Sequence, residues 1–173
     1  HPHLRSLLRH LASLGETISA SSETTGIEWL RDSGLDWVHG WPMKHTVAPA
    51  PAMVTKELQK LMDDMLDTMY AADGIGLAAV QIGVPKRIIV MDIERSKDKK
   101  NPMYFVNPVN KERNSEKSTY EEGCLSVPNQ FAEINRPRNC DVEYLDYNGK
   151  KQLLKADGLL ATCIQHEMDH LEG

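Results

Sequence analysis

Residues 157–173 read DGLLATCIQHEMDHLEG, and no other segment of the chain is as informative. Within it, residues 166–170 form the pattern H-E-x-x-H on a predicted helix. Four residues advance a helix by about 400°, so His166 and His170 lie on nearly the same face and can bind one metal ion. Glu167 points roughly 100° aside, where it can reach a water on that metal but is poorly placed to bind it. The segment therefore predicts a helix that carries a metal site.

The surroundings of the two histidines support this interpretation. Leu159, Cys163, His166 and His170 recur at helical spacing, which places both histidines on the inward, apolar face of the helix. An imidazole without a partner costs free energy there, so binding to a metal is favoured. The alternative is a pair of surface histidines that are four residues apart by chance. The apolar stripe and the intervening Glu167 argue against it.

A third metal ligand is needed, because a catalytic zinc-like site uses three protein ligands and keeps one open position. Thermolysin-type peptidases take it from a Glu well downstream, but only residues 171–173 follow here. The ligand must come from upstream, and Cys124 within residues 121–128 (EEGCLSVP) is the best candidate, since a thiolate binds borderline divalent ions well. Cys140 and Cys163 compete for the role, although a small buried apolar residue is the simpler interpretation of each.

Residues 74–81 read GIGLAAVQ and imitate the dinucleotide-binding fingerprint G-x-G-x-x-A. That fingerprint follows a strand and opens a helix, whereas this segment follows a predicted helix and precedes a predicted strand. We interpret the glycines as allowing the backbone to approach an extended ligand closely, or else as the turn that ends a helix. The side-chain amide of Gln81 could donate to an oxygen that gains negative charge.

The remaining periodicity predicts a second helix and several strands. Thr55 can cap a helix that has apolar residues at three-and-four spacing and ends at Asp73-Gly74. Runs rich in β-branched residues predict strands, and Asn148-Gly149 predicts a hairpin turn. The predicted strands are 86–93, 103–106, 131–134, 141–147 and 151–155. The order helix, strands, helix indicates an α+β fold.

Composition limits the class of protein. A length of 173 residues favours one domain, and 40% hydrophobic with 26% charged residues fits a globular chain. The net charge of −5 leaves no basic excess for phosphates, so we expect no nucleic-acid ligand. No apolar run approaches the roughly 20 residues that span a bilayer, so we expect no membrane anchor. Three cysteines at irregular spacing suit a reducing compartment.

Two compositionally different parts meet near residue 50. All three tryptophans and five of the seven histidines precede it, and residues 48–52 (APAPA) form a stiff connector. We expect residues 1–50 to be an atypical N-terminal segment, either an extension or the remnant of a targeting sequence. Residues 1–22 support the second, being Arg- and Ser-rich with one acidic residue. Residues 51–173 then form the catalytic domain.

Three motifs in this order closely resemble those of bacterial-type peptide deformylase: residues 74–81 (GIGLAAVQ), 122–126 (EGCLS) and 165–170 (QHEMDH). The resemblance runs from about residue 54 to residue 173. It implies an α+β fold with antiparallel strands packed around a central helix that carries the H-E-x-x-H. It also implies a hydrolase that removes the formyl group from N-formylmethionine at the start of nascent polypeptides.

The same resemblance implies a role for particular residues. Cys124, His166 and His170 would hold the metal, and Glu167 would be the general base and acid. The amide of Gln81 and the backbone N–H of Leu125 would stabilise the oxyanion. The residues implied to bind substrate are Ile75, Gly76 and Gly123, with Cys163 lining the methionine pocket. Fe²⁺ is the implied native metal, and Zn²⁺ or Ni²⁺ could occupy the same site.

Physical chemistry supports the same reaction. A divalent ion held by one thiolate and two imidazoles keeps one position for water and lowers its pKa from ~15.7 towards neutrality. Glu167 then takes the proton of that water and returns it to the departing amine. One alternative is an H-E-x-x-H zinc peptidase, which the missing downstream ligand disfavours. Another is a non-catalytic metal-binding relative, which would need a fourth protein ligand.

Partners and location follow from the resemblance alone. They are N-formylmethionyl nascent peptides and the ribosome, in the bacterial cytoplasm or alternatively in a mitochondrion or plastid. The family normally continues beyond the position of Gly173 through an apolar segment and often a C-terminal helix. We therefore expect the natural chain to be longer.

Overall fold

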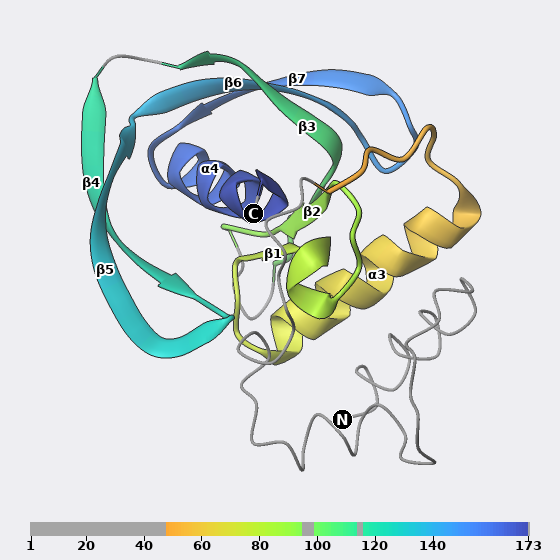
Figure 1. Ribbon diagram of the computed structural model, residues 1–173, viewed down its shortest axis with the longest axis horizontal. Helices are drawn as coiled ribbons and strands as arrows, with labels where there is room; N and C mark the ends of the chain where they lie inside the picture. The colour runs from red at the N-terminus through yellow and green to blue at the C-terminus, as the bar shows by residue number, and fades with distance from the viewer. Residues whose placement is uncertain (1–47, 95–98, 114–115, 173) are drawn as a thin grey trace.

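The computed structural model describes residues 48–94, 99–113 and 116–172 (Figure 1). The predicted N-terminal segment, apart from residues 48–50, lies outside the described residues. Within them, no helix is both long and apolar enough to cross a membrane. The elements in chain order are α3 (Lys56–Ala71), β1 (Gly76–Ala78), the 3₁₀ helix η1 (Ala79–Ile82), β2 (Ile88–Met91), β3 (Met103–Arg113), β4 (Lys117–Cys124), β5 (Val127–Pro137), β6 (Asn139–Leu145), β7 (Lys151–Asp157) and α4 (Gly158–Glu172).

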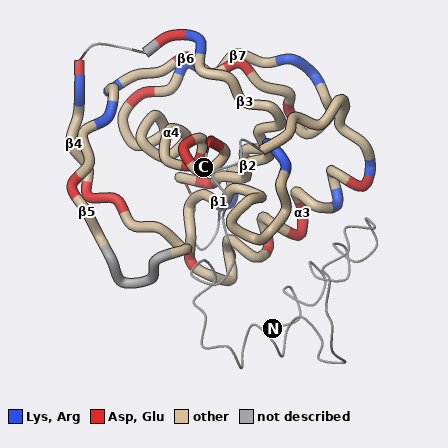
Figure 2. The backbone as a smooth tube through the Cα atoms, viewed as in Figure 1, with Lys and Arg blue, Asp and Glu red and all other residues tan. Residues whose placement is uncertain are grey.

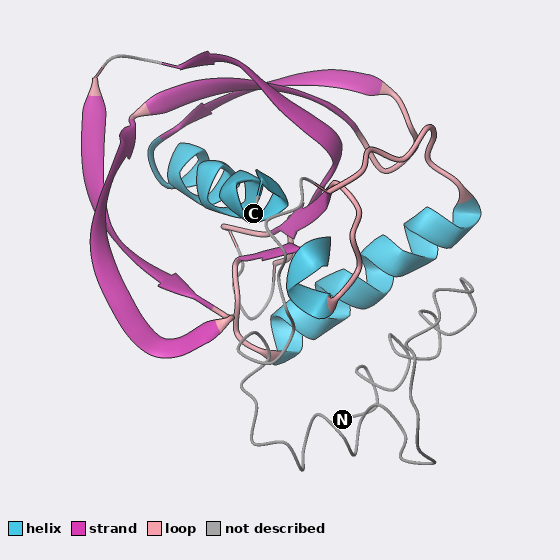
Figure 3. Cartoon of the chain, in the orientation of Figure 1, coloured by secondary structure: helices cyan, strands magenta, loops and turns pink. Residues whose placement is uncertain are grey.

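The strands of this part of the chain form two antiparallel sheets. The larger has the order β1-β2-β3-β6-β7, and the smaller pairs β4 with β5. Figure 3 shows α4 in the middle, with the long strands of the larger sheet curving around it and the β4–β5 hairpin to one side. Lys and Arg are interspersed with Asp and Glu along the outer strands (Figure 2). The predicted α+β fold, with antiparallel strands around a central helix, is confirmed.

Helix α3 forms as the sequence predicts. The Thr55 hydroxyl accepts a hydrogen bond from the Leu58 backbone N–H at 3.2 Å. The helix ends at Ala71, slightly before the predicted end, and Asp73 then takes a left-handed φ of 57°, which Asp tolerates better than most residues. Its apolar stripe is buried against β2: Leu58, Leu61, Met62, Met65, Leu66 and Met69.

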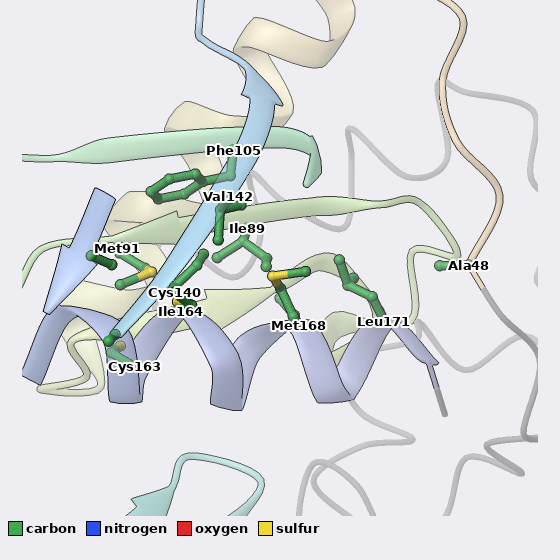
Figure 4. Packing of buried hydrophobic residues seen from close by; sticks show 13 residues of the cluster. Ala48, Ile89, Met91, Phe105, Cys140, Val142, Cys163, Ile164, Met168 and Leu171 are labelled. Atoms are coloured by element: carbon green, nitrogen blue, oxygen red, sulfur yellow. The ribbon is translucent and has the colours of Figure 1, made fainter. Parts of the chain in front are cut away.

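A second core fixes α4 against the larger sheet (Figure 4). Ile164, Met168 and Leu171 extend from the helix towards the strands, where they pack with Ile89 and Phe105. Full burial of each such side chain stabilises the fold by roughly 1.5–3 kcal/mol. His166 lies about 200° around the helix from Ile164 and from Met168, and His170 lies about 200° from Met168. The two histidines therefore face away from this core.

The prediction that the histidines lie on an inward, apolar face of α4 is therefore wrong in one respect. Leu159 is 46% exposed, and His166 and His170 are only partly buried. The cause is that one side of α4 packs against the core, whereas the other side borders a cavity. The stripe that contains the histidines lines the cavity side.

Some strand boundaries differ from the predictions. β2 is shorter than residues 86–93, while β3 and β5 continue well beyond their apolar runs because their partners continue alongside them. Strand β4 was not predicted at all. It alternates exposed and partly buried residues without a run of apolar ones, so its sequence carries little strand signal.

The proline-rich connector lies along the rest of the fold. Ala48 is buried, and its backbone N–H donates to the Leu171 carbonyl at 3.0 Å. The carbonyl of Pro51 accepts from the side chain of Asn107 at 2.8 Å. This segment thus meets both the end of α4 and strand β3.

Candidate active site

A cavity of about 600 Å³ lies between α4, the segment before β1 and the β4–β5 hairpin. Residues from all three sequence motifs line it. The predicted site residues in its wall are Ile75, Gly76, Gln81, Gly123, Cys124, Leu125, Cys163, His166 and Glu167. His170, one turn further along α4, completes the predicted set.

The three predicted metal ligands come together. One candidate ligand atom from each of Cys124, His166 and His170 lies within 4.8 Å of the other two, and Cys124 Sγ is 3.3 Å from His170 Nε2. Cys124 is the last residue of β4, where the register with β5 shifts. Cys140 is instead buried in the core, as its simpler interpretation predicted. One thiolate and two imidazoles form a donor set that suits Fe²⁺, Zn²⁺ or Ni²⁺.

The surroundings of Cys124 favour the ionised thiol, which is the form that binds metals. Burial acts to raise its pKa, but hydrogen bonds with His166 and His170 and with the Ser126 backbone outweigh burial and lower the pKa of Cys124 to about 5. Cys163 differs, because burial raises the pKa of its thiol well above the usual value. A neutral thiol at Cys163 fits the wall of a pocket rather than a ligand.

A chain of charged groups orients His166. Its Nδ1 lies 2.8 Å from Glu122 Oε2, and Arg136 donates to both carboxylate oxygens of Glu122 at 2.6 and 3.0 Å. Arg136 also donates to Asp169 at 2.6 Å. A carboxylate on one ring nitrogen fixes the ring and leaves the other nitrogen for a metal. Burial acts to raise the pKa of Glu122, but the bonds to Arg136 and His166 outweigh it and lower that pKa.

Glu122 and Arg136 were not among the predicted site residues. One signal was available for Glu122, because residues two apart in a strand share a face, and Glu122 precedes the predicted ligand Cys124 by two. Arg136 lies on the partner strand, opposite Ser118 in the register. Its role depends on how the hairpin packs against α4, which spacing along the chain does not show.

Glu167 occupies a buried position beside the predicted ligands. It is 5% exposed, and its Oε2 has no hydrogen-bond partner among the described residues. Burial raises its pKa to about 7, against the smaller lowering effect of the histidines. A carboxyl group with a pKa near neutrality can both accept and donate a proton.

Gly76 permits this arrangement. A Cβ atom at residue 76 would lie 2.5 Å from Glu167 Oε1 and 3.0 Å from Cys163 Sγ. The β1 backbone therefore approaches α4 more closely than any residue with a side chain would allow. Gly76 thus lies against a buried carboxylate of the chain itself, whereas the close approach of these glycines to an extended ligand stays a prediction.

The amide of Gln81 is held in one orientation. Its Oε1 accepts from the Ala78 backbone N–H at 2.8 Å, and its Nε2 donates to Ser126 Oγ at 2.8 Å. The same nitrogen lies 3.5 Å from Cys124 Sγ. A donor fixed in this way needs no reorganisation when charge develops nearby.

Comparison with known proteins agrees with this geometry. The sequence profile of the family described as "Polypeptide deformylase" matches residues 40–173. The chain belongs to the polypeptide deformylase family. Enzymes of this family are metal-dependent hydrolases that remove N-formyl groups from nascent peptides, and the chain is an enzyme of this kind. The peptidase and non-catalytic alternatives are not favoured.

Individual deformylases show the extent of the likeness. The peptide deformylase of Pelagibacter ubique is 80% identical over 120 residues, which cover 69% of this chain and 70% of that protein. That of Rhizobium meliloti is 50% identical over 132 residues, 76% of each chain. Among solved structures, the peptide deformylase of Synechococcus elongatus in complex with actinonin gives a TM-score of 0.74 at 42% identity, covering 78% of this chain and 73% of that one. The Ehrlichia chaffeensis deformylase gives 0.72 at 42% identity, with coverage of 80% and 83%.

Proposed function

We propose that this chain removes the formyl group of N-formylmethionyl peptides, with a divalent metal ion held by Cys124, His166 and His170 and with Glu167 as general base and acid. One observation carries the proposal. A sulfur and two imidazole nitrogens converge beside a buried carboxylate that has an oxygen without a partner among the described residues. The family resemblance favours Fe²⁺ as the native ion, with Zn²⁺ or Ni²⁺ able to bind the same atoms.

The protein supplies proton transfer around the ion. When bound, the ion acts as a Lewis acid that makes water reactive near neutral pH. Glu167, with a pKa of about 7, takes the proton of the attacking water and passes it to the nitrogen that leaves. Transfer to nitrogen is needed because an amine departs poorly without it.

Other groups stabilise charge on the carbonyl oxygen of the formyl group. A side-chain amide has two N–H donors, and Ser126 holds the nitrogen of Gln81 through one of them. The second N–H, which points to Cys124 Sγ at 3.5 Å in this structure, and the backbone N–H of Leu125 are the donors that we assign to this oxygen. Removal of one such donor typically costs about 3–4 kcal/mol of transition-state stabilisation.

The substrate backbone is placed by the edge of the larger sheet. β1 pairs only with β2 among the described strands, so its other edge is open to an extended peptide. We assign contacts with the peptide to Ile75 and Gly76 on this side and to Gly123 across the cavity. Cys163 is assigned to the wall of the methionine pocket.

Partners and location follow from the same proposal. The named relatives include bacterial proteins, and formylmethionine begins new chains in bacteria. We therefore infer that the enzyme acts in the bacterial cytoplasm on nascent chains that emerge from the ribosome.

The proposal is tested by measuring formate. The protein is loaded anaerobically with Fe²⁺ and incubated with a formyl-Met peptide, and we expect Glu167→Gln to lower the rate by about 10²–10⁴-fold while metal content stays the same. Glu112→Gln, at an exposed position of β3, is the matched control and should keep the wild-type rate. Undiminished formate release by Glu167→Gln would contradict the role of Glu167.

A further inference from the structure

A buried carboxyl group that the proposed mechanism does not use lies at the end of β2. Asp92 directly follows the last residue of that strand and is 0% exposed. Its Oδ2 accepts hydrogen bonds from the Tyr70 hydroxyl at 2.6 Å and from the Asn101 backbone N–H at 2.9 Å, and its Oδ1 accepts from the Glu94 backbone N–H at 3.2 Å. A buried carboxyl group costs free energy unless it is hydrogen-bonded, and these three donors hold the side chain in one orientation.

The same residue also holds the segment that leads to β1. The Asp92 backbone N–H donates to the Ile75 carbonyl at 2.9 Å. Tyr70 is the penultimate residue of α3, and Ile75 directly precedes β1. Asp92 therefore contacts residue 70 through its side chain and residue 75 through its backbone, so it fixes both ends of the segment 71–74.

This segment forms one wall of the cavity. The lining residues from this part of the chain are Ala72, Asp73, Gly74, Ile75 and Gly76. A Cβ atom at residue 74 would lie 2.5 Å from Leu125 Cδ1 and 3.1 Å from Leu125 Cγ, so the side chain of Leu125 packs directly against the backbone of Gly74. The wall thus has no room to move towards Leu125, while Asp92 holds its two ends.

The bond between Asp92 and Ile75 also determines how β1 presents its backbone. In an antiparallel pair, the N–H and C=O groups of alternate residues point to the partner strand, and those of the residues between them point away. Gly76 lies opposite Met91 in the register, next to the hydrogen-bonded pair of Ile75 and Asp92. The backbone groups of Gly76 therefore point to the open edge of β1, where the proposed function places the peptide.

We propose that Asp92 is a positioning residue for peptide binding, whose contacts with Tyr70 and Ile75 fix the edge of β1 along which the backbone of the substrate lies. This inference rests on the proposed function. Asp92 acts on the chain before Gly76, whereas Glu167 and the predicted metal ligands lie on α4 and β4. Loss of its contacts should therefore weaken peptide binding more than it slows the reaction. The effect should grow with peptide length, because a longer peptide pairs with more of the edge.

The test measures kcat and KM separately for substrates of two lengths, formyl-Met amide and a formyl-Met-Ala-Ser peptide. Tyr70→Phe removes one hydrogen bond to Asp92 and keeps the aromatic ring. We expect it to raise KM for the longer peptide by about fivefold, while kcat and the KM of formyl-Met amide stay within about twofold of wild type. Asp92→Asn replaces one acceptor oxygen with a donor and should change KM in the same direction.

Tyr147→Phe is the matched control. The Tyr147 hydroxyl donates to Asp63 of α3 at 3.0 Å, so this variant also removes a bond between a tyrosine and a carboxylate, but neither residue is among those that line the cavity. We expect it to keep the wild-type KM for both substrates. Hydrogen exchange gives a readout that is independent of turnover. The amides of residues 72–76 should exchange faster in Tyr70→Phe than in wild type, and at the wild-type rate in Tyr147→Phe.

Each result decides between the two proposals. If wild type releases formate and Tyr70→Phe keeps the wild-type KM for the longer peptide, the inference about Asp92 is wrong and the proposed function stands. An equal rise of KM for both substrates, or the same rise in Tyr147→Phe, would also overturn the inference, since the effect would then be one of general stability. If wild type releases no formate from either substrate, the proposed function fails and the inference fails with it. If Asp92→Asn does not fold, Tyr70→Phe still decides.

Discussion

The two sides of α4 differ in how completely their buried side chains are packed and hydrogen-bonded. On the side of the larger sheet, Ile164, Met168 and Leu171 are buried among apolar neighbours (Figure 4). On the cavity side, Thr162 and Glu167 keep buried oxygens without partners among the described residues. One face of α4 thus stabilises the fold, whereas the other face carries unpaired buried polar groups that lower the free energy of unfolding. The difference teaches that unsatisfied groups mark function here, because the rest of the helix is well packed.

Alanine substitutions of the partly exposed Cys124 and of the buried Cys140 give the strongest test of this division. Cys124→Ala should abolish stoichiometric metal binding, because it removes the thiolate ligand. Cys140→Ala, its matched control in the core, should keep one ion per chain but lower the free energy of unfolding by roughly 1 kcal/mol. Metal content measured by elemental analysis checks both. The ligand set would be wrong if Cys140→Ala lost the metal and Cys124→Ala kept it.

Truncation on each side of α4 should affect different quantities. Ile164→Ala removes a fully buried side chain and should lower the free energy of unfolding by about 2–5 kcal/mol. Leu159→Ala, at a position 46% exposed on the cavity side, should lower it far less and should instead raise KM for the formyl-Met peptide. Chemical denaturation and steady-state kinetics provide the two measurements. Equal losses of stability would show that both sides belong to the core.

Gly76→Ala tests how tightly β1 must approach α4. The added Cβ would displace Glu167, and misplacement of a catalytic group by about 1 Å can lower the rate by about 10²-fold. Metal content should not change. Gly149→Ala is the control, since Gly149 has a φ of +79° at a surface turn, so its substitution should lower stability without lowering the rate. An unimpaired Gly76→Ala enzyme would contradict the assignment of Glu167.

Arg136→Met tests the groups that orient His166. It removes the partner of Glu122 and so loosens His166, which should weaken metal binding by about 10–100-fold. Arg138→Met is the matched control, because Arg138 is 53% exposed and pairs with surface carboxylates. Titration with a metal-competing chelator measures the dissociation constants. The positioning role would be refuted by equal constants in both variants.

Local spacing made the helices and the metal cluster predictable. The stripe of α3 and the H-E-x-x-H of α4 are periodic within a few residues, and the order of the three motifs linked Cys124 to the two histidines. Strand β4 was missed because its inward residues are polar or small. Arg136 was missed because its role depends on how the β4–β5 hairpin packs against α4, and contacts between residues so far apart in sequence are set by tertiary packing.

Among the described strands, those of the smaller sheet share no hydrogen-bonded ladder with those of the larger one. Side chains such as Arg136 and Gln165 link β5 to α4, and an ion shared by Cys124, His166 and His170 would close a further loop between β4 and that helix. Such an ion would bind the folded chain and not the unfolded one, so its binding free energy would add to the free energy of unfolding. Chelation should therefore inactivate the enzyme and, in the same event, accelerate hydrogen exchange in the β4–β5 hairpin.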